Sequence, residues 1–145
     1  MKKSLVLLFL LLPVYVLANG KENMECKKFY MLKKQNNEYV RTIPKIADYP
    51  DEPAFETTWH IDCKNNKVFF TGGIFEREYS LENHKYDKKS QVYLIDISGE
   101  EEGETYKYTL KIKYIDNDKA YIYGYYNDEI KDVYTNTPDK YRLLK

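Results

Sequence analysis

The chain contains only two histidines, and they decide most of the metal and acid–base chemistry open to it. His60 and Asp62 would share one face of a strand, where they could hold a metal ion or orient an imidazole. Catalytic zinc sites use three protein ligands, so one histidine with one carboxylate leaves such a site incomplete. We therefore interpret the pair as an exposed polar strand face and predict no metal site.

The residues needed for nucleophilic catalysis or phosphate binding are not arranged in the usual motifs. No serine lies in a Gly-x-Ser-x-Gly sequence. Cys63 lies three residues after His60, and positions three apart on a strand face opposite sides. Gly72-Gly73 is isolated, and no helix is predicted after it, so it does not indicate a phosphate-binding loop. We predict that the protein is not an enzyme and uses no cofactor.

An acidic run at 99–104 holds four glutamates in six residues. Such a run could bind a cation, but consecutive acids repel one another and no Asp-x-Asp-x-Asp-Gly loop is present. We interpret it as a solvated loop between two strands.

The start of the chain has the three parts of a secretory signal peptide: a basic start, an apolar stretch and small residues for cleavage. The Met-Lys-Lys start and short leader are typical of bacteria. The apolar stretch 4–18 is shorter than the roughly 20 residues of a membrane-spanning helix. We predict a signal peptide over 1–18, cut after residue 18 or 20, and a single domain over 19–145. We expect this domain in the periplasm or outside the cell, with no stable membrane insertion.

Cys26 and Cys63 are the only two cysteines. An even count in an oxidising compartment favours one disulfide between them. Closing this loop would stabilise the fold by about 4 kcal/mol on the chain-entropy model. The alternative is two separate buried thiols.

Charge argues against two classes of partner. The 145 residues are 43% hydrophobic and 32% charged, with 23 basic and 23 acidic side chains. Loss of the two leader lysines leaves a net charge of about −2. Proteins that bind nucleic acid, or bind membranes electrostatically, carry an excess of basic charge, so we expect neither partner.

Patterns typical of strands recur along the chain, and helical patterns do not. Residues 106–114 alternate strictly between apolar and polar side chains, which indicates a strand with one buried and one wet face. Only 81–90 could form a short helix. The expected strands are 26–34, 38–43, 57–63, 68–71, 74–80, 91–98, 106–114 and 120–126, with a last short strand in the tail 139–145.

Short strands joined by short turns predict an all-β domain, either a small antiparallel barrel of about eight strands or a sandwich. A calycin-like architecture is one form of such a barrel, and a lipocalin-like barrel is the one to test. The Gly-x-Trp signature of lipocalins is absent near the first strand, where Trp59 instead follows Thr57-Thr58. The Ser-Gly-x-x-Tyr loop of exported lysozyme inhibitors is also absent, so we assign the chain to neither family.

The chain contains 16 tyrosines, which is an unusually large number for its length. Tyrosine packs well on strands and tolerates partial exposure, so many of them could simply fill a barrel wall. They could also form a surface that recognises a protein, or line a cavity for a small ligand. The candidate residues, on a sheet surface or in the barrel lumen, are Trp59, Tyr106, Tyr108, Tyr114, Tyr121, Tyr123 and Tyr125.

The predicted function is binding of another protein, as an inhibitor or immunity protein, through a tyrosine-rich sheet surface. The alternative is a lipocalin-like carrier of a small apolar or aromatic ligand in a tyrosine-lined barrel. A cavity of a few hundred Å³ would favour the carrier. A solid core with an exposed tyrosine patch would favour the protein binder.

The strongest local prediction concerns the hairpin of 106–114 with 121–125. We expect its Tyr/Leu/Ile face to be buried, because a slip of one residue would bury lysines instead. The side chains expected in water are Lys107, Thr109, Lys111 and Lys113.

Overall fold

The computed structural model describes residues 26–46, 49, 51–124 and 128–145. The predicted signal peptide, 1–18, and Tyr125 lie outside the described residues. The described elements are β1 (Lys28–Gln35), β2 (Glu38–Thr42), β3 (Phe55–Asp62), β4 (Lys67–Gly73), β5 (Phe75–Asp87), β6 (Val92–Glu101), β7 (Glu104–Tyr114), β8 (Lys119–Tyr123), β9 (Asp132–Thr135), the 3-10 turn η1 (Pro138–Lys140) and β10 (Leu143–Leu144). Within this part of the chain, no helix has the length and hydrophobicity needed to cross a membrane.

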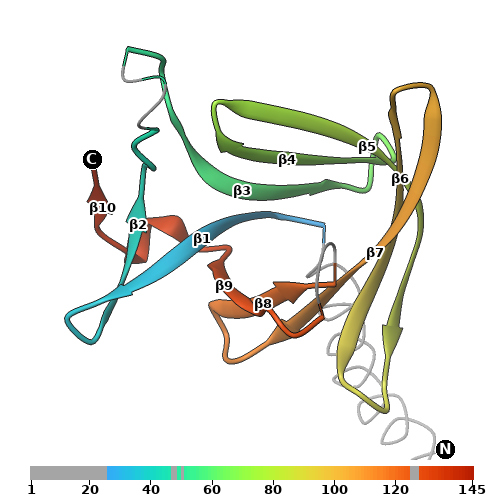
Figure 1. Cartoon of the computed structure of the whole chain (residues 1–145). Helices are drawn as coiled ribbons and strands as arrows, with labels where there is room; N and C mark the ends of the chain where they lie inside the picture. Colours follow the sequence, from blue (N-terminus) through green and yellow to red (C-terminus); the bar gives the residue numbers. More distant parts are fainter. Residues whose placement is uncertain (1–25, 47–48, 50, 125–127) are drawn as a thin grey trace, which may run out of the picture.

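Eight of these strands close into an antiparallel barrel, which confirms the predicted all-β fold (Figure 1). The strands follow the order β1-β3-β4-β5-β6-β7-β8-β9, and β9 pairs back onto β1. β1 can close the barrel because residues 28–30 pair with β3 while residues 30–32 pair with β9. Closure removes the free edges that an open sheet would expose.

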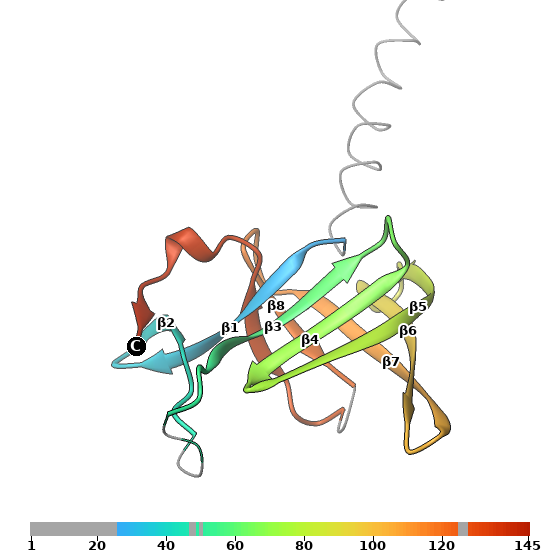
Figure 2. The ribbon, with the colours of Figure 1, turned by 90° about the horizontal axis from the view of Figure 1, so that it is seen from above.

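The other two strands, β2 and β10, lie outside the barrel (Figures 1 and 2). β2 pairs with the last residues of β1, and β10 adds to β2 as a parallel strand. Arg41 of β2 ties this extension to the barrel, since it donates hydrogen bonds to both carboxylate oxygens of Glu56 on β3, at 2.8 and 2.5 Å. It also donates to the carbonyl of Pro138 at 3.2 Å. The paired carboxylate raises the pKa of Arg41.

Residues that adopt positive φ make the tight turns between strands. Asn36 and Asn37 have φ of 48° and 65° between β1 and β2, as a type I′ turn requires. Glu102 and Gly103, at 53° and 82°, do the same between β6 and β7. Asparagine and glycine tolerate this conformation, whereas glutamate rarely adopts it. The turn predicted after β1 is confirmed. The loop predicted over 99–104 is shorter than expected, because β6 runs to Glu101 and β7 begins at Glu104.

The core is formed by the inward faces of the barrel strands. On β7, Leu110 and Ile112 are fully buried while Lys107 and Lys113 are exposed, which confirms the predicted alternation in the middle of that strand. Side chains that are at most 1% exposed include Phe29, Ile61, Val68, Ile95, Ile97, Leu110 and Ile112.

The partner strand β8 differs from the expectation. Its buried residues are Ala120 and Ile122, and Ile122 pairs with Ile112 of β7. Tyr121 and Tyr123 therefore lie on the other face, opposite the lysines of β7. The tyrosines of the two strands do not share a face.

The short helix that the sequence allowed over 81–90 does not form. β5 continues through this segment to Asp87 and pairs with β6 along the way. The pairing shifts between Leu81 and Asn83, which marks a β-bulge. The segment is too polar to have a strong preference of its own, so the long neighbouring strand β6 decides its conformation.

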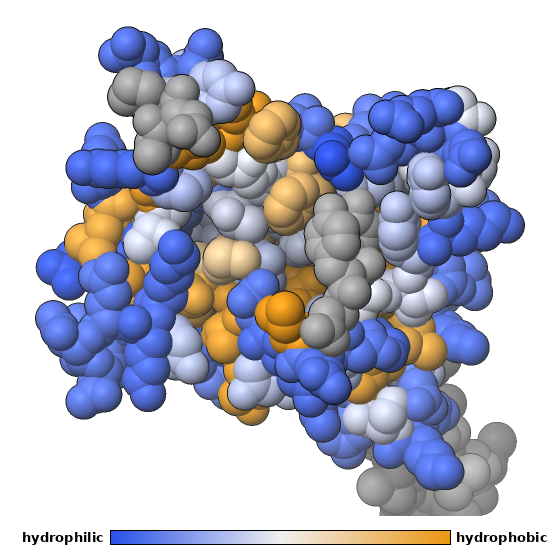
Figure 3. Space-filling model, in the orientation of Figure 1, coloured by the Kyte–Doolittle hydropathy of each residue, from blue (hydrophilic) through white to orange (hydrophobic). Residues whose placement is uncertain are grey.

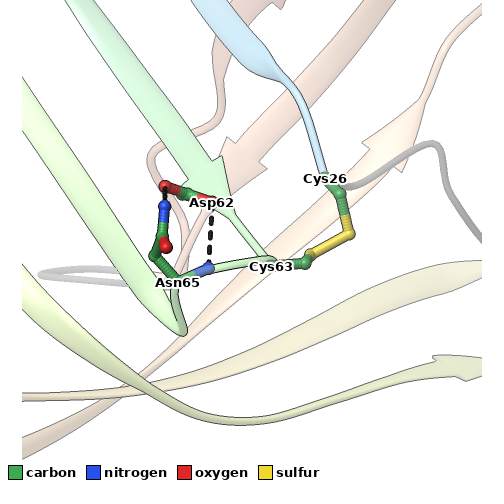
Figure 4. Close-up of a disulfide and its surroundings, with 4 residues drawn as sticks. All are labelled: Cys26, Asp62, Cys63 and Asn65. Atoms are coloured by element: carbon green, nitrogen blue, oxygen red, sulfur yellow. Dashed lines mark hydrogen bonds between the residues drawn. A yellow bond between two sulfur atoms is a disulfide. The ribbon is translucent and has the colours of Figure 1, made fainter.

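Cys26 and Cys63 form the predicted disulfide, where β1 begins and β3 ends (Figure 4). Their Cα atoms are 5.6 Å apart, and the residues are separated by 37 positions in the sequence. Beside it, the carboxylate of Asp62 accepts hydrogen bonds from the backbone N–H and the side-chain amide of Asn65, at 3.1 and 2.7 Å. These bonds fix the turn into β4 and lower the pKa of Asp62. We call this end of the barrel the disulfide end.

Candidate functional site

The barrel holds a pocket of about 250 Å³ at the end away from the disulfide. This open end is where β3 begins, β4 ends and β8 leads toward β9. Figure 3 shows a hollow over the middle of the barrel, with apolar and weakly polar side chains in it and hydrophilic ones around it. We call the space the apolar pocket. Its main apolar walls are Met31, Trp59, Phe70, Leu110, Ile122 and Tyr134.

Trp59 and Phe70 form the aromatic wall of this pocket. They are cross-strand partners on β3 and β4, and directly opposed residues of a pair point to the same face. Their ring centroids are 4.7 Å apart, and the ring planes are tilted by 48°. Trp59 is buried, whereas Phe70 keeps partial contact with solvent. The wall therefore offers aromatic surface to a ligand that enters from the open end.

One polar group is buried in the same wall, the hydroxyl of Tyr134 on β9. This side chain is 3% exposed, and the indole N–H of Trp59 donates a hydrogen bond to its hydroxyl. Burial raises the pKa of Tyr134 well above its ordinary value, because a phenolate would lose its hydration there. The neighbouring carboxylate of Asp132 raises the pKa further. Tyr134 is therefore neutral at physiological pH and gives the pocket a hydrogen-bonding group without a charge.

A second pocket, of about 240 Å³, is lined by residues of β5, β6 and β7. Tyr79 in its wall contacts Trp59 of the apolar pocket, with 6.2 Å between ring centroids. We call this space the polar pocket. Its side-chain lining includes Arg77, Tyr79, Glu101, Tyr106 and Tyr108.

The inner face of β5, β6 and β7 changes from apolar to charged toward the open end. A Cβ atom built on Gly99 would lie 2.8 Å from Cδ1 of Tyr79, so the absence of a side chain at Gly99 lets this ring lie across β6. From the core outward, the three cross-strand rows are Leu81, Ile97 and Tyr108, then Tyr79, Gly99 and Tyr106, then Arg77, Glu101 and Glu104.

Among the described residues, Phe55, Phe75 and Ile130 are large hydrophobic side chains that remain exposed at the open end. Phe55 begins β3 and Phe75 begins β5, and they are 53% and 63% exposed. Both lie near the turn between β4 and β5, since Phe55 pairs with Gly73 and Phe75 with Gly72. Ile130, which precedes β9 and lines the apolar pocket, is 59% exposed. The rim of the open end is thus partly hydrophobic.

The structure brings four of the sequence-predicted residues to the open end. Trp59 and Tyr123 line the apolar pocket, and Tyr106 and Tyr108 line the polar pocket. Tyr106 is 38% exposed, so the expected burial of the tyrosine face fails at the outer end of β7. The strand extends beyond the packed core there, and its inner face becomes pocket wall.

Tyr114 and Tyr121 lie away from both pockets. Tyr114 packs against the core residues Phe29 and Tyr93, at 6.4 and 6.1 Å between ring centroids. Tyr121 lies on the outer face of β8. Tyr123 also lies on the outer face of β8, at the mouth of the apolar pocket. The Nζ atoms of Lys111 and Lys131 lie 5.8 and 5.3 Å from the centroid of its ring.

The histidine singled out from the sequence lies on the outer face of β3. His60 stacks on Phe69 of β4 at 5.8 Å between ring centroids, and Asp62 is held by Asn65. Across the described ranges, no three His, Cys, Asp or Glu side chains gather closely enough to hold a metal ion.

Sequence reasoning missed Phe70, Tyr79 and Tyr134 as pocket residues. Phe70 and Tyr79 belong to strands that were predicted. Phe70 pairs with Trp59, and Tyr79 lies on β5, the next strand after β4, so this order of strands could have suggested a shared face. Tyr134 lies in the four-residue strand β9, which is too short to show an alternating pattern.

In comparisons with known proteins, no family model, no curated protein and no solved structure matches this chain. The function is therefore inferred from the geometry of the open end.

Proposed function

We propose that this protein is an exported, non-catalytic binding protein that takes a small apolar or aromatic molecule into the open end of its barrel. The apolar pocket carries the proposal, since it combines hydrophobic walls with access from solvent. A barrel of eight strands is just wide enough to be filled by its own side chains. A remaining space of about 250 Å³ favours the carrier over the protein binder.

The volume of the apolar pocket limits the size of the ligand. A cavity of about 150 Å³ lined by Leu, Ile and Phe holds benzene, and drug-sized ligands occupy about 300–1,000 Å³. The pocket lies between these values. It fits a molecule of one or two rings, or a short branched chain.

The side chains of the pocket favour an aromatic ligand without negative charge. Stacking on aromatic rings adds about 0.5–1.5 kcal/mol beyond the burial of apolar area, and Trp59 and Phe70 supply such rings. The neutral hydroxyl of Tyr134 can contribute a hydrogen bond. Asp132 lies exposed among the lining residues, and its charge disfavours an anion there.

The leader and the disulfide support a role outside the cytoplasm, in the periplasm or the medium. Disulfides persist in oxidising compartments, and Cys26 is bonded to Cys63. The exported protein should begin near Asn19 or Lys21. N-terminal sequencing of the exported material tests this, and an intact Met1 would contradict it.

Trp59 gives a direct test of ligand binding. It is the only tryptophan of the chain and lines the apolar pocket, so tryptophan fluorescence reports on this site alone. Titration with naphthalene and with a series of alkylbenzenes should change the emission saturably and raise the melting temperature. Emission and melting temperature that stay constant across the whole series would contradict the proposal.

Phe69 and Phe70 provide a matched pair of variants. They are neighbours on β4, but Phe70 lines the pocket while Phe69 stacks on His60 outside the barrel. Phe70→Ala should weaken binding about tenfold or more, which corresponds to about 1.4 kcal/mol. Phe69→Ala should leave the affinity unchanged. An equal loss in both variants would mean that general destabilisation, and not the pocket, controls binding.

Binding of a protein partner is the second candidate, favoured by the exposed rim. Phe55 on β3 and Phe75 on β5 lie on either side of the end of β4 and are exposed, and exposed apolar side chains can mark interaction sites. The test is a pull-down with the mature chain from producing and neighbouring cells, read by mass spectrometry. A stoichiometric partner lost with Phe75→Asp but kept with Phe70→Ala would establish this candidate. A small molecule lost with Phe70→Ala would support the carrier.

A further inference from the structure

The polar pocket has an aromatic corner next to the apolar pocket. The rings of Tyr79 and Tyr108 meet at 84° with 6.3 Å between centroids. Tyr106 lies 6.4 Å from Tyr108 with its plane within 18° of parallel. The face of an aromatic ring is negative and attracts cations, and enclosing aromatic walls are how proteins hold quaternary ammonium groups.

The charged row beyond these tyrosines is rich in carboxylates. Glu101 and Glu104 lie directly opposite each other across β6 and β7, an arrangement that costs stability because like charges repel. The hydroxyl of Tyr106 donates a hydrogen bond to Glu104 at 3.1 Å, which raises the pKa of this tyrosine. Arg77 approaches Glu101 at 3.7 Å. The row of Arg77, Glu101 and Glu104 holds one positive and two negative side chains, so one further positive charge would balance it.

The aromatic walls of the two pockets are in contact. Trp59 of the apolar pocket contacts Tyr79 at 6.2 Å, and Tyr79 contacts Tyr108 at 6.3 Å, both measured between ring centroids. A ligand whose ring lies beside Trp59 would pass a short chain along the edge of Tyr79 to reach the three tyrosines.

We propose that the polar pocket binds a cationic ammonium group on the same ligand whose apolar part occupies the apolar pocket. This inference rests on the proposed function and names the ligand class, a small amphiphile with one hydrophobic ring or chain and one positive head. The tyrosine faces contact the head group, and Glu101 with Glu104 balances its charge. Glu101 and Glu104 of the acidic run would then bind the head group, a role that the residues of a solvated loop would not have.

The test compares three probes that share a phenylbutyl chain and differ only in the head group. The heads are trimethylammonium, the isosteric neutral tert-butyl group, and carboxylate. Binding to the full mature protein is followed by Trp59 fluorescence and by calorimetry. The trimethylammonium probe should bind about fivefold more tightly than the tert-butyl probe, or better, and the carboxylate probe should bind most weakly.

Two substitutions separate ring contact from hydrogen bonding at Tyr106, which is 38% exposed and so tolerates change. Tyr106→Leu should reduce the preference for the ammonium head while leaving the tert-butyl probe almost unaffected. Tyr106→Phe keeps the ring face and should keep most of the preference. Thermal melts confirm that both variants are folded.

Substitution of Arg77 tests which sign of charge the polar pocket prefers in a head group. Arg77→Gln removes a competing positive charge, so it should tighten the ammonium probe and weaken the carboxylate probe. Equal binding of all three probes to the unaltered protein would overturn the inference and leave the apolar pocket as the binding site. Tightest binding of the carboxylate probe, lost in Arg77→Gln, would also overturn it. No binding of any probe would overturn the inference together with the proposed function.

Discussion

Along β7, the inward face passes from core to binding surface within a few residues. Toward the disulfide end, Ile112 is fully buried and Tyr114 packs against core rings. Toward the open end, Tyr106 stands partly in solvent beside Glu101. Alternation along a strand therefore sets which side chains point inward. Their distance from the packed middle of the barrel decides whether they become core or pocket.

The largest expected effect comes from deleting a side chain in the packed half. Ile112→Ala should lower the free energy of unfolding by about 2–5 kcal/mol, because it leaves a cavity where Ile112 was fully buried. Tyr106→Ala, on the inward face of the same strand, should cost less than about 1 kcal/mol. Denaturant unfolding of both variants measures the difference. A larger loss for Tyr106→Ala would reverse the assignment of core and pocket along β7.

The second effect concerns the covalent bond at the disulfide end. Replacing Cys26 and Cys63 together by serine should cost about 2–4 kcal/mol, because the unfolded chain regains the freedom that the bond removes. Ligand affinity at the open end should stay the same. Intact mass without reduction should show the loss of two hydrogens in the native protein. Two thiols that can be alkylated in the native protein would contradict the bond.

A third test addresses Tyr134, whose side chain is buried in the wall of the apolar pocket. Tyr134→Phe should cost about 1 kcal/mol near neutral pH, since the hydrogen bond from Trp59 is lost. The raised pKa also predicts a pH dependence. Below about pH 10 the tyrosine is protonated in both the folded and the unfolded state, so it adds no slope.

Above that pH the unfolded state releases the proton of Tyr134 while the folded state retains it. The free energy of unfolding should therefore fall with rising pH, by up to about 1.4 kcal/mol per pH unit from this group. Tyr134→Phe should show a shallower fall between about pH 9 and pH 11. Identical slopes in the two proteins would mean that the hydroxyl titrates as it does in water.

The smallest effect is expected on the outer face of β7. Lys111 is half-buried, pairs with Asp128 at 2.8 Å and lies 5.8 Å from the ring of Tyr123. Surface ion pairs contribute little, so Lys111→Ala should cost less than about 0.5 kcal/mol. Thermal melts beside those of Ile112→Ala check this. If Lys111→Ala unfolds the protein while Ile112→Ala has no effect, the inner and outer faces are inverted.

Elements with a strong local pattern could be predicted from the sequence. The middle of β7 alternates without interruption, and Asn36-Asn37 marks the turn after β1, so both were predicted correctly. Segment 81–87 carries no such pattern. Its strand conformation comes from pairing with β6, and the local sequence does not predict this tertiary contact.

The face of β8 was harder to predict because both of its faces are hydrophobic. Tyr121 and Tyr123 bury more area than Ala120, which made them the expected core. The core position next to Tyr114 requires a small side chain, and Ala120 pairs with that residue. The side-chain volume that fits beside Tyr114 decided which face of β8 is buried. This volume depends on neighbouring residues that only the folded structure brings together.

The pockets could be predicted only in part for the same reason. Trp59, Tyr106 and Tyr108 were named from residue type and alternation. Phe70 and Tyr79 join them through pairings across β3, β4 and β5, which depend on a register that the sequence leaves open.

The pairing of β1 with β9 has a consequence for the order of assembly. β1 is the first barrel strand to be synthesised and β9 is the last, and the barrel closes only when Tyr30 meets Thr135. Contacts between such distant residues slow folding, and a sheet that waits for its last strand exposes edges that can aggregate. The bond between Cys26 and Cys63 joins β1 to β3, so it can hold the first strand in place until the last one arrives. Oxidation before closure should therefore increase the yield of refolded monomer.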